Sequence, residues 1–328
     1  MSVRDICPSD RILLHIGFHK TATTWFQSEL FSRPEFDFKL LSARNLVHQA
    51  FCISNPFPCD RDNGVRQIVT EAHEATALGR YFVVSHERLS GYPASGGFDS
   101  RMLADRLKLH FPNARLFCLF REQRAMILSA WRQQVVDGGG LSLSHFIDPP
   151  EPEIRRMPLF DPMMYQYSHL LEHYRGLFGA GNVLFRPYEQ FCAEPARILA
   201  DLADLLEDEK LRRCAEGLAT NMKTPNPSVS MPVLHMQRIL NVLFARTQLS
   251  QGYLINIGTG PIRAVIRIID RAIGRNMLRP MNSYSQRKAL QKISGRLGVF
   301  FDDDNARLSR LIGMRLSDLG YSVNEQAV

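Results

Sequence analysis

The sequence lacks the long apolar runs, paired cysteines and secretory leader that would place it in a membrane or outside the cell. No apolar run reaches 18 residues, so a membrane-spanning helix is not expected. The opening residues, MSVRDICPSDR, are too polar for a secretory signal. The six cysteines form no CxxC pair and stand beside no histidine at metal-ligand spacing. We therefore expect a cytoplasmic protein without a bound metal.

The first 230 residues also lack a basic surplus, with 26 Lys and Arg against 27 Asp and Glu. From residue 231 onward, 14 Lys and Arg stand against 6 Asp and Glu, so the net charge of +7 arises there. Within this region 261–279 places an arginine at every fourth position, with Ile and Val opposite. The arginines are Arg263, Arg267, Arg271, Arg275 and Arg279.

A helix of this pattern suits an anionic membrane surface, such as the inner face of the cell membrane, or an acidic polysaccharide. It is equally typical of a helix that packs on the core and presents a solvated arginine face. No nucleic-acid-binding motif accompanies the arginines, so nucleic acid is not an expected partner.

Short apolar runs alternate with longer amphipathic ones, which predicts a parallel sheet flanked by helices. The expected strands are 11–17, 81–85, 114–120 and 182–186. The expected helices are 23–32, 64–79, 99–110, 122–136, 162–178 and 196–207. We predict an α/β core at 1–230 and a basic helical extension at 231–328 that packs on it. In such sheets ligands bind beyond the carboxyl ends of the strands.

The first predicted strand runs into RILLHIGFHKTATTWFQSELF, residues 11–31. A tight turn that opens into a helix directs backbone N–H groups and the helix dipole at one point. Lys20 adds a full positive charge there, and Thr23 and Thr24 add hydroxyl donors. The nucleotide-triphosphate loop reads GxxxxGK[ST], but here the lysine precedes the hydroxyls, so a magnesium–hydroxyl site is not indicated. This segment predicts an anion-binding loop or, alternatively, an ordinary junction with an exposed lysine.

A second anion site is predicted at the end of the strand ARLFCLF, which runs directly into Arg121. Ser129 follows eight residues later, about two turns down the next helix. An arginine fork and a hydroxyl together suit phosphate oxygens. Alternatively, Arg121 forms an ion pair with Glu122 or with a neighbouring helix.

Together these segments resemble the sulfotransferases that use 3′-phosphoadenosine 5′-phosphosulfate (PAPS). The 5′-phosphosulfate loop of that family reads Pro-Lys-Ser-Gly-Thr-Thr-Trp, and this chain has His19, Lys20, Thr21, Ala22, Thr23, Thr24 and Trp25. The family's 3′-phosphate motif is an arginine at a strand end with a serine eight residues on, which Arg121 and Ser129 match. RPYEQFCAEPARIL resembles the family's strand-then-Tyr-Glu segment, in which the tyrosine, here Tyr188, approaches the adenine. FDDDNARLSRLIGMRLSDLGYSV resembles the closing helix of bacterial members.

Two positions depart from the family pattern. Ala22 replaces the loop glycine, so a backbone position that favours φ > 0 carries a Cβ. The late nucleotide loop of the animal cytosolic enzymes is not evident; Asn221, Lys223 and Thr224 take its place or form a plain turn.

The resemblance implies PAPS as co-substrate, adenosine 3′,5′-bisphosphate (PAP) as product, and transfer of a sulfonate to an acceptor hydroxyl without a metal. Lys20 is expected to stabilise charge on the leaving phosphate oxygen. Thr21, Thr23 and Thr24 are expected to hold the phosphate, and Trp25 to face the adenine or join the core. The acceptor needs a base. The second strand ends in Ser85-His86-Glu87, and Glu87 is favoured over His86, with His19 as a third candidate.

The predicted function is therefore PAPS-dependent O-sulfonation of a hydroxyl-bearing acceptor, with a carbohydrate or lipid-linked glycan favoured by the basic C-terminal third. Two alternatives remain. One is a membrane- or glycan-binding protein that kept the fold without catalysis. The other is a P-loop kinase-like phosphotransferase, which the loop spacing disfavours.

Overall fold

The computed structural model describes residues 6–53, 63–148, 159–220, 229–245, 247, 254–255, 257–272, 275–324 and 326. Its strands are β1 (Ile12–His15), β2 (Phe38–Leu40), β3 (Tyr81–Ser85), β4 (Arg115–Phe120) and β5 (Val183–Pro187). The helices before the C-terminal third are α1 (Thr23–Trp25), α2 (Arg44–Val47), α3 (Asn63–Ala77), α4 (Ser100–His110), α5 (Gln123–Val136), α6 (Leu143–Ile147), α7 (Tyr167–Phe178), α8 (Tyr188–Ala193), α9 (Pro195–Leu206) and α10 (Glu209–Thr220). The C-terminal helices are α11 (Met231–Phe244), α12 (Thr259–Ala272), α13 (Arg275–Leu297) and α14 (Asp302–Ile312).

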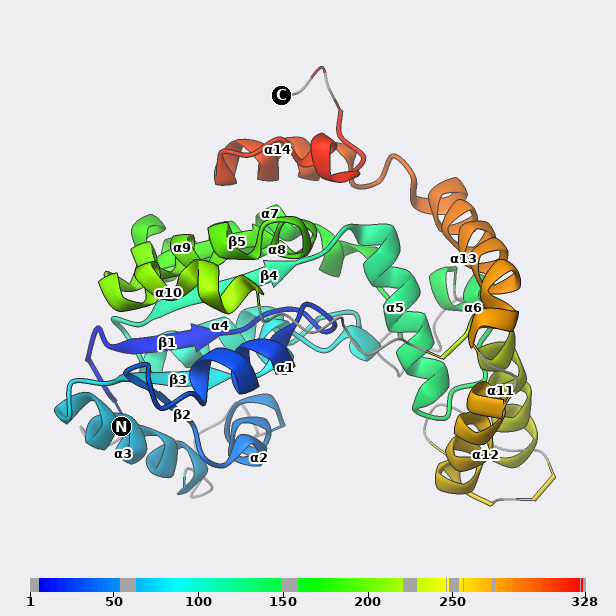
Figure 1. Cartoon of the computed structure of the whole chain (residues 1–328), viewed down its shortest axis with the longest axis horizontal. Helices are drawn as coiled ribbons and strands as arrows, with labels where there is room; N and C mark the ends of the chain where they lie inside the picture. Colours follow the sequence, from blue (N-terminus) through cyan, green and yellow to red (C-terminus); the bar gives the residue numbers. More distant parts are fainter. Residues whose placement is uncertain are drawn as a thin grey trace.

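The strands form one sheet in the order β2-β3-β1-β4-β5, and each pair is parallel. β1 is the central strand, with Ile12 opposite Phe82 and Leu14 opposite Leu116. Parallel neighbours require crossover connections, which helices supply here. The predicted α/β architecture, a parallel central sheet with flanking helices, is confirmed (Figure 1).

Helices cover both faces of the sheet, which explains why the strands are apolar throughout rather than alternating. Successive residues of β1 enter different cores: Ile12 and Leu14 join one apolar cluster and Leu13 the other. The first cluster includes side chains of α3, α4, α5 and α7. The second includes α9, α10 and the helical turns after α1. Both layers fix the loops at the carboxyl edge of the sheet.

The expected elements form near their predicted bounds, and strand β2 and helices α2, α6, α8 and α10 form in addition to them. The edge strand β2 was not predicted, because three residues, FKL, are too short to show a periodicity. The helix expected at 23–32 begins as α1 and continues with wide, π-helical turns over Phe26–Phe31. Such turns are frequent at functional sites, and these follow directly after the predicted anion loop.

The C-terminal third packs on the body through α11, α12, α13 and α14. α11 and α12 lie beside the end of α5 (Figure 1), where Asn241 Nδ2 donates to the carbonyls of Val135 (2.7 Å) and Gly139 (3.0 Å). Arg263 Nε donates to the Val136 carbonyl at 2.7 Å. These bonds satisfy carbonyls that the end of a helix leaves unpaired. The division into a core at 1–230 and an extension at 231–328 stays a prediction.

α14 packs against α7 on the opposite side of the molecule from α12 (Figure 1). Gln123 and Asn305 exchange amide hydrogen bonds of 2.6 and 3.2 Å, and Ser168 Oγ donates to Asp304. These polar side chains are buried, so the pairing satisfies groups that would otherwise be costly to bury. Across the helices that the structure describes, none combines the length and apolar character needed to cross a membrane.

Candidate functional site

A cavity of about 410 Å³, partly open to solvent, lies at the carboxyl edge of the sheet, where the loop after β1 approaches α5. Lys20, Thr23 and Thr24 from the loop line it, and Ser129 lines it from α5. Glu87, two residues beyond β3, also lines it. The cavity therefore brings together residues from three strand ends that are distant in sequence.

The loop after β1 places two residues other than glycine in the left-handed region, Lys20 at φ 64° and Ala22 at φ 62°. Ala22 is the position at which the resembled family has glycine, and its positive φ accounts for that preference. Left-handed backbone costs a residue with a Cβ about 1–2 kcal/mol, and such strain gathers at ligand-binding loops. The Thr21 hydroxyl fastens the turn by donating to the Phe18 carbonyl at 2.6 Å.

Replacing Ala22 by glycine is expected to raise the free energy of unfolding by about 0.5–1 kcal/mol. Glycine removes the left-handed strain, and the greater freedom of the unfolded chain offsets part of that gain. Chemical denaturation measures the change. Ala200→Gly, in the middle of α9, is the matched control and should lose about 1 kcal/mol. Equal losses in both variants would show that the loop at residue 22 is not strained.

The candidate bases occupy different positions. Glu87 and His19 line the cavity, whereas His86 does not. The Nδ1 atom of His86 accepts from the Arg88 N–H at 3.1 Å and so caps the short helix that begins at Glu87. His86 is therefore held as a structural cap, with its pKa lowered mainly by burial.

The electrostatics keep both cavity-lining candidates in a form able to accept a proton at neutral pH. Burial acts to raise the pKa of Glu87, but its own backbone N–H, the neighbouring histidines and Arg44 outweigh burial and lower it. Arg44 contacts the carboxylate at 3.3 Å. Burial lowers the pKa of His19 to about 4, partly countered by the negative charge of Glu87. At pH 7 Glu87 is ionised and His19 is neutral.

Arg121 directly follows β4 and is not among the residues that line the cavity. Its guanidinium lies 5.2 Å from the ring centre of Tyr188, a cation–π contact. Glu189 accepts from the Glu122 N–H at 3.1 Å and from the Tyr321 hydroxyl at 2.8 Å. This carboxylate links the starts of α5 and α8 to the C-terminal segment, and so positions Arg121 and Tyr188 together.

Trp25 belongs to an aromatic cluster that extends from the loop to Tyr188, the residue in contact with Arg121. Its ring packs edge-on against Phe26 (5.1 Å) and Phe191 (5.3 Å), and Phe191 in turn contacts Tyr188. The aromatic contacts connect the lysine loop with the Arg121 region through one continuous cluster. The two expected anion sites therefore belong to adjoining parts of the same sheet edge.

Several buried polar atoms of the cavity lining, and of Trp25 and Arg121 at the same edge of the sheet, have no hydrogen-bond partner among the described residues. These atoms are His19 Nε2, Thr23 Oγ1, Trp25 Nε1, Arg121 Nε, Tyr165 Oη and both amide atoms of Gln134. An unsatisfied buried polar group costs about 1–3 kcal/mol, so their concentration at one place indicates a site built for a polar ligand.

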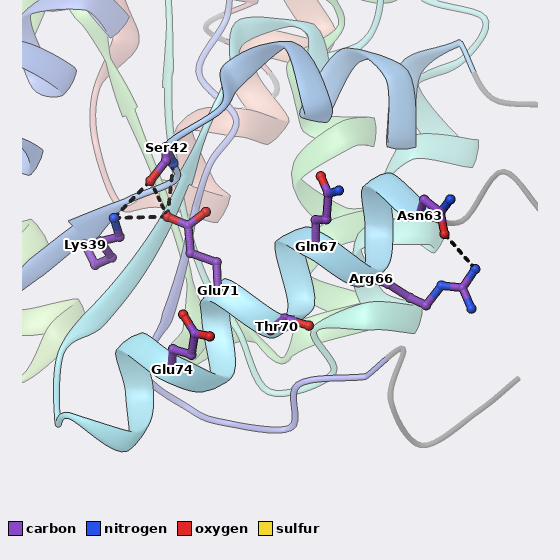
Figure 2. A pocket seen from close by; sticks show the side chains of 8 residues that line it. All are labelled: Lys39, Ser42, Asn63, Arg66, Gln67, Thr70, Glu71 and Glu74. Carbon is purple, nitrogen blue, oxygen red and sulfur yellow. Dashed lines mark hydrogen bonds and ion pairs between the residues drawn. The ribbon is translucent and has the colours of Figure 1, made fainter.

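A second hollow, of about 580 Å³, is open to solvent at the outer edge of the sheet, between the end of β2 and α3. Figure 2 shows Lys39 and Ser42 both reaching Glu71, at 3.2 and 2.6 Å. Arg66 likewise donates to Asn63 at 2.9 Å. Because these polar groups satisfy one another, the larger hollow shows less sign of a missing ligand than the inner cavity.

Sequence reasoning missed several residues of the cavity lining, among them Gln134 and Tyr165. Outside the lining, burial lowers the pKa of Arg132, and the like charge of Arg121 lowers it further. A glutamine on the buried side of α5 was the available signal for Gln134. Asn221, Lys223 and Thr224 lie outside the described residues, as do the side chains of Arg271, Arg275 and Arg279.

No family model and no curated protein matches this chain. Among solved structures, it is similar to a sulfotransferase from Alicyclobacillus acidocaldarius, with 17% identity and a TM-score of 0.48 over 94% of this chain and 98% of the other. It is also similar to the sulfotransferase domain from the curacin biosynthetic pathway, with 13% identity and a TM-score of 0.38 over 72% of this chain and 97% of the other.

Proposed function

We propose that the protein transfers a sulfonate group from PAPS to an acceptor hydroxyl. The observation that carries the proposal is the shared cavity, in which Lys20, Ser129 and Glu87 meet from three strand ends. A cation, phosphate-binding hydroxyls and an ionised carboxylate are the groups that such a transfer needs.

The residues present fit the doubly phosphorylated donor. Thr23 Oγ1 and Arg121 Nε are buried atoms without a partner in the described chain, and both can donate to phosphate oxygens. Lys20, Thr23 and Thr24 would hold the 5′-phosphosulfate, and Arg121 with Ser129 the 3′-phosphate. Trp25 and Tyr188 would border the adenine.

The donor supplies an activated sulfonate whose bond to the 5′-phosphate oxygen breaks as a bond to the acceptor oxygen forms. Lys20 stabilises the negative charge that grows on that phosphate oxygen, more in the transition state than in the ground state. Glu87 takes the proton of the acceptor hydroxyl, with His19 as the alternative base.

Donor recognition is tested by binding PAP and adenosine 5′-phosphate to the parent and to Arg121→Gln. A hydrogen bond to a charged group contributes about 1.5–3 kcal/mol, so the Kd for PAP should rise about 10- to 150-fold. The Kd for adenosine 5′-phosphate should change much less, because it lacks the 3′-phosphate. Isothermal titration calorimetry measures both, and Arg101→Gln, at an exposed position of α4, is the control.

The same titrations separate the alternatives. Tight binding of ATP with magnesium, and none of PAP, would favour the phosphotransferase. PAP binding without transfer to any hydroxyl would favour a binding protein on this fold.

We also propose that α12 contacts an anionic membrane surface. Ile262 and Ile266 are buried against α11, but Val265 and Ile268 of the next face are 47% and 66% exposed, beside Arg267. Exposed apolar residues flanked by arginine suit a lipid interface. Co-sedimentation with phosphatidylserine vesicles should fall several-fold for Ile268→Asp, because the charge must leave water on binding. Binding equal to that of the parent would refute the contact.

A further inference from the structure

The cavity is lined by apolar as well as polar side chains. Phe18, Met126 and Phe146, each 3% exposed or less, contribute apolar surface. Gln134, 4% exposed, and Tyr165, 1% exposed, lie in the same lining. Two buried polar side chains therefore share the lining with buried apolar ones, in a cavity that is partly open to solvent.

Neither polar side chain has its hydrogen-bonding capacity used within the described parts of the chain. Both amide atoms of Gln134 and the hydroxyl of Tyr165 are buried without a partner. The amide and the hydroxyl can each donate and accept a hydrogen bond, so the two side chains can together bind one polar group of a bound molecule. Leaving these groups without hydrogen bonds lowers the stability of the protein and brings no compensating gain. A ligand that hydrogen-bonds to them is therefore the simplest reason for their presence.

The position of Gln134 is set by the backbone around it. A Cβ on residue 139 would lie 1.9 Å from Gln134 Nε2, so a side chain there would displace the amide from its present position. The Gly139 N–H donates to the main-chain carbonyl of Gln134 at 2.8 Å, and Asn241 Nδ2 donates to the Gly139 carbonyl at 3.0 Å. Gly139 is therefore held beside the amide and leaves it room.

We propose that Gln134 and Tyr165 form the recognition end of an acceptor pocket for compact alcohols and phenols with an apolar skeleton and one further polar group. This inference rests on the proposed function, since Glu87 and His19 lie in the same cavity. A free sugar carries a hydroxyl on most carbons, and each one desolvated against Phe18, Met126 or Phe146 would lack a partner. An apolar ring loses nothing there and gains by leaving water.

Two pairs of acceptors of matched shape test the proposal with the full-length protein and PAPS. Cyclohexanol and myo-inositol share a six-carbon ring but differ in hydroxyl number. Phenol and 4-hydroxybenzamide differ in one polar group. We expect the parent to prefer cyclohexanol to myo-inositol, and 4-hydroxybenzamide to phenol by about tenfold, the typical effect of completing a buried hydrogen-bonding site. A preference for myo-inositol would overturn the proposal.

Gln134→Leu and Tyr165→Phe should remove the advantage of 4-hydroxybenzamide over phenol by raising the KM for 4-hydroxybenzamide. Neither variant should lower the melting temperature, because each removes a group without a partner. Tyr174→Phe is the control: its hydroxyl donates to the Leu89 carbonyl at 3.3 Å, so it should lower the melting temperature without changing acceptor preference. Unchanged preference in both cavity variants would refute the assignment.

Direct binding of 4-hydroxybenzamide by calorimetry separates this inference from the proposed function. If the parent binds 4-hydroxybenzamide, loses it in both variants, and yet binds no PAP, the pocket stands and the sulfonate transfer fails. If the parent binds PAP and transfers sulfonate but binds phenol and 4-hydroxybenzamide equally, the pocket assignment fails and the transfer stands.

Discussion

Replacing Lys20 by methionine is expected to lower kcat for sulfonate transfer by about 10²–10³, the usual effect of removing one group that stabilises charge in a transition state. Lys20 lies in the loop lining the cavity, and the loop threonines and Arg121 remain to bind the donor. The Kd for PAP should therefore rise much less than kcat falls. Single-turnover transfer with labelled PAPS measures the rate, and calorimetry measures the Kd.

Lys39→Met provides the matched control for Lys20→Met. Lys39 is also a partly exposed lysine near a strand end, but it contacts Glu71 at the outer hollow, 3.2 Å away (Figure 2). Its loss should leave kcat within about twofold, because surface ion pairs contribute little. A kcat of Lys20→Met equal to that of the parent would show that this lysine takes no part in the transfer.

Replacing Glu87 by glutamine is expected to lower kcat by about 10²–10⁴, the range that general-base catalysis contributes. The amide keeps the size of the side chain but cannot accept the acceptor's proton. His19→Gln should change kcat little if Glu87 is the base. If His19 is the base, His19→Gln should cause the large loss of kcat and Glu87→Gln the small one. Glu71→Gln, at the outer hollow, is the control carboxylate.

The pH dependence follows from the pKa shifts. The active form of Glu87 is ionised, so transfer rises with pH through its pKa, which is lowered from its usual value of 4.5. His19, with its pKa lowered to about 4, is likewise neutral and basic above that pH. Transfer should therefore be flat in pH from about 5.5 to 8 for either base. An inflection of the pH–rate profile near pH 6.5 would exclude both residues as the base and would point to a solvent-exposed histidine instead.

The sequence predicted the long elements of the core well because each of them carries its own signal. The apolar run before Gly17, the run ending at Arg121 and the Gly179 turn indicate their strands and helix end within a few residues. The sequence also indicated the positive φ of residue 22, because Ala22 stands where the resembled family has glycine. The three-residue strand β2 carries no such signal, because its pairing with β3 depends on partners elsewhere in the chain.

The base could not be chosen from the sequence, where His86 and Glu87 are adjacent. The structure separates them because the chain leaves β3 at Ser85 and turns at once into a short helix. His86 caps that helix, and Glu87 reaches the cavity beside His19. Local spacing does not encode this difference, since it depends on where the loop after β1 lies.

By itself the sequence determined that the chain forms a parallel α/β sheet with a lysine-bearing loop after its first strand. Apolar periodicity and turn residues act over about ten residues, so they can be read without knowing the rest of the chain. Only the tertiary structure decided that Gln134 and Tyr165 share a cavity with Lys20. Their segments meet because crossover helices pack on both faces of the sheet, and such long-range packing leaves no mark in the spacing of any single segment.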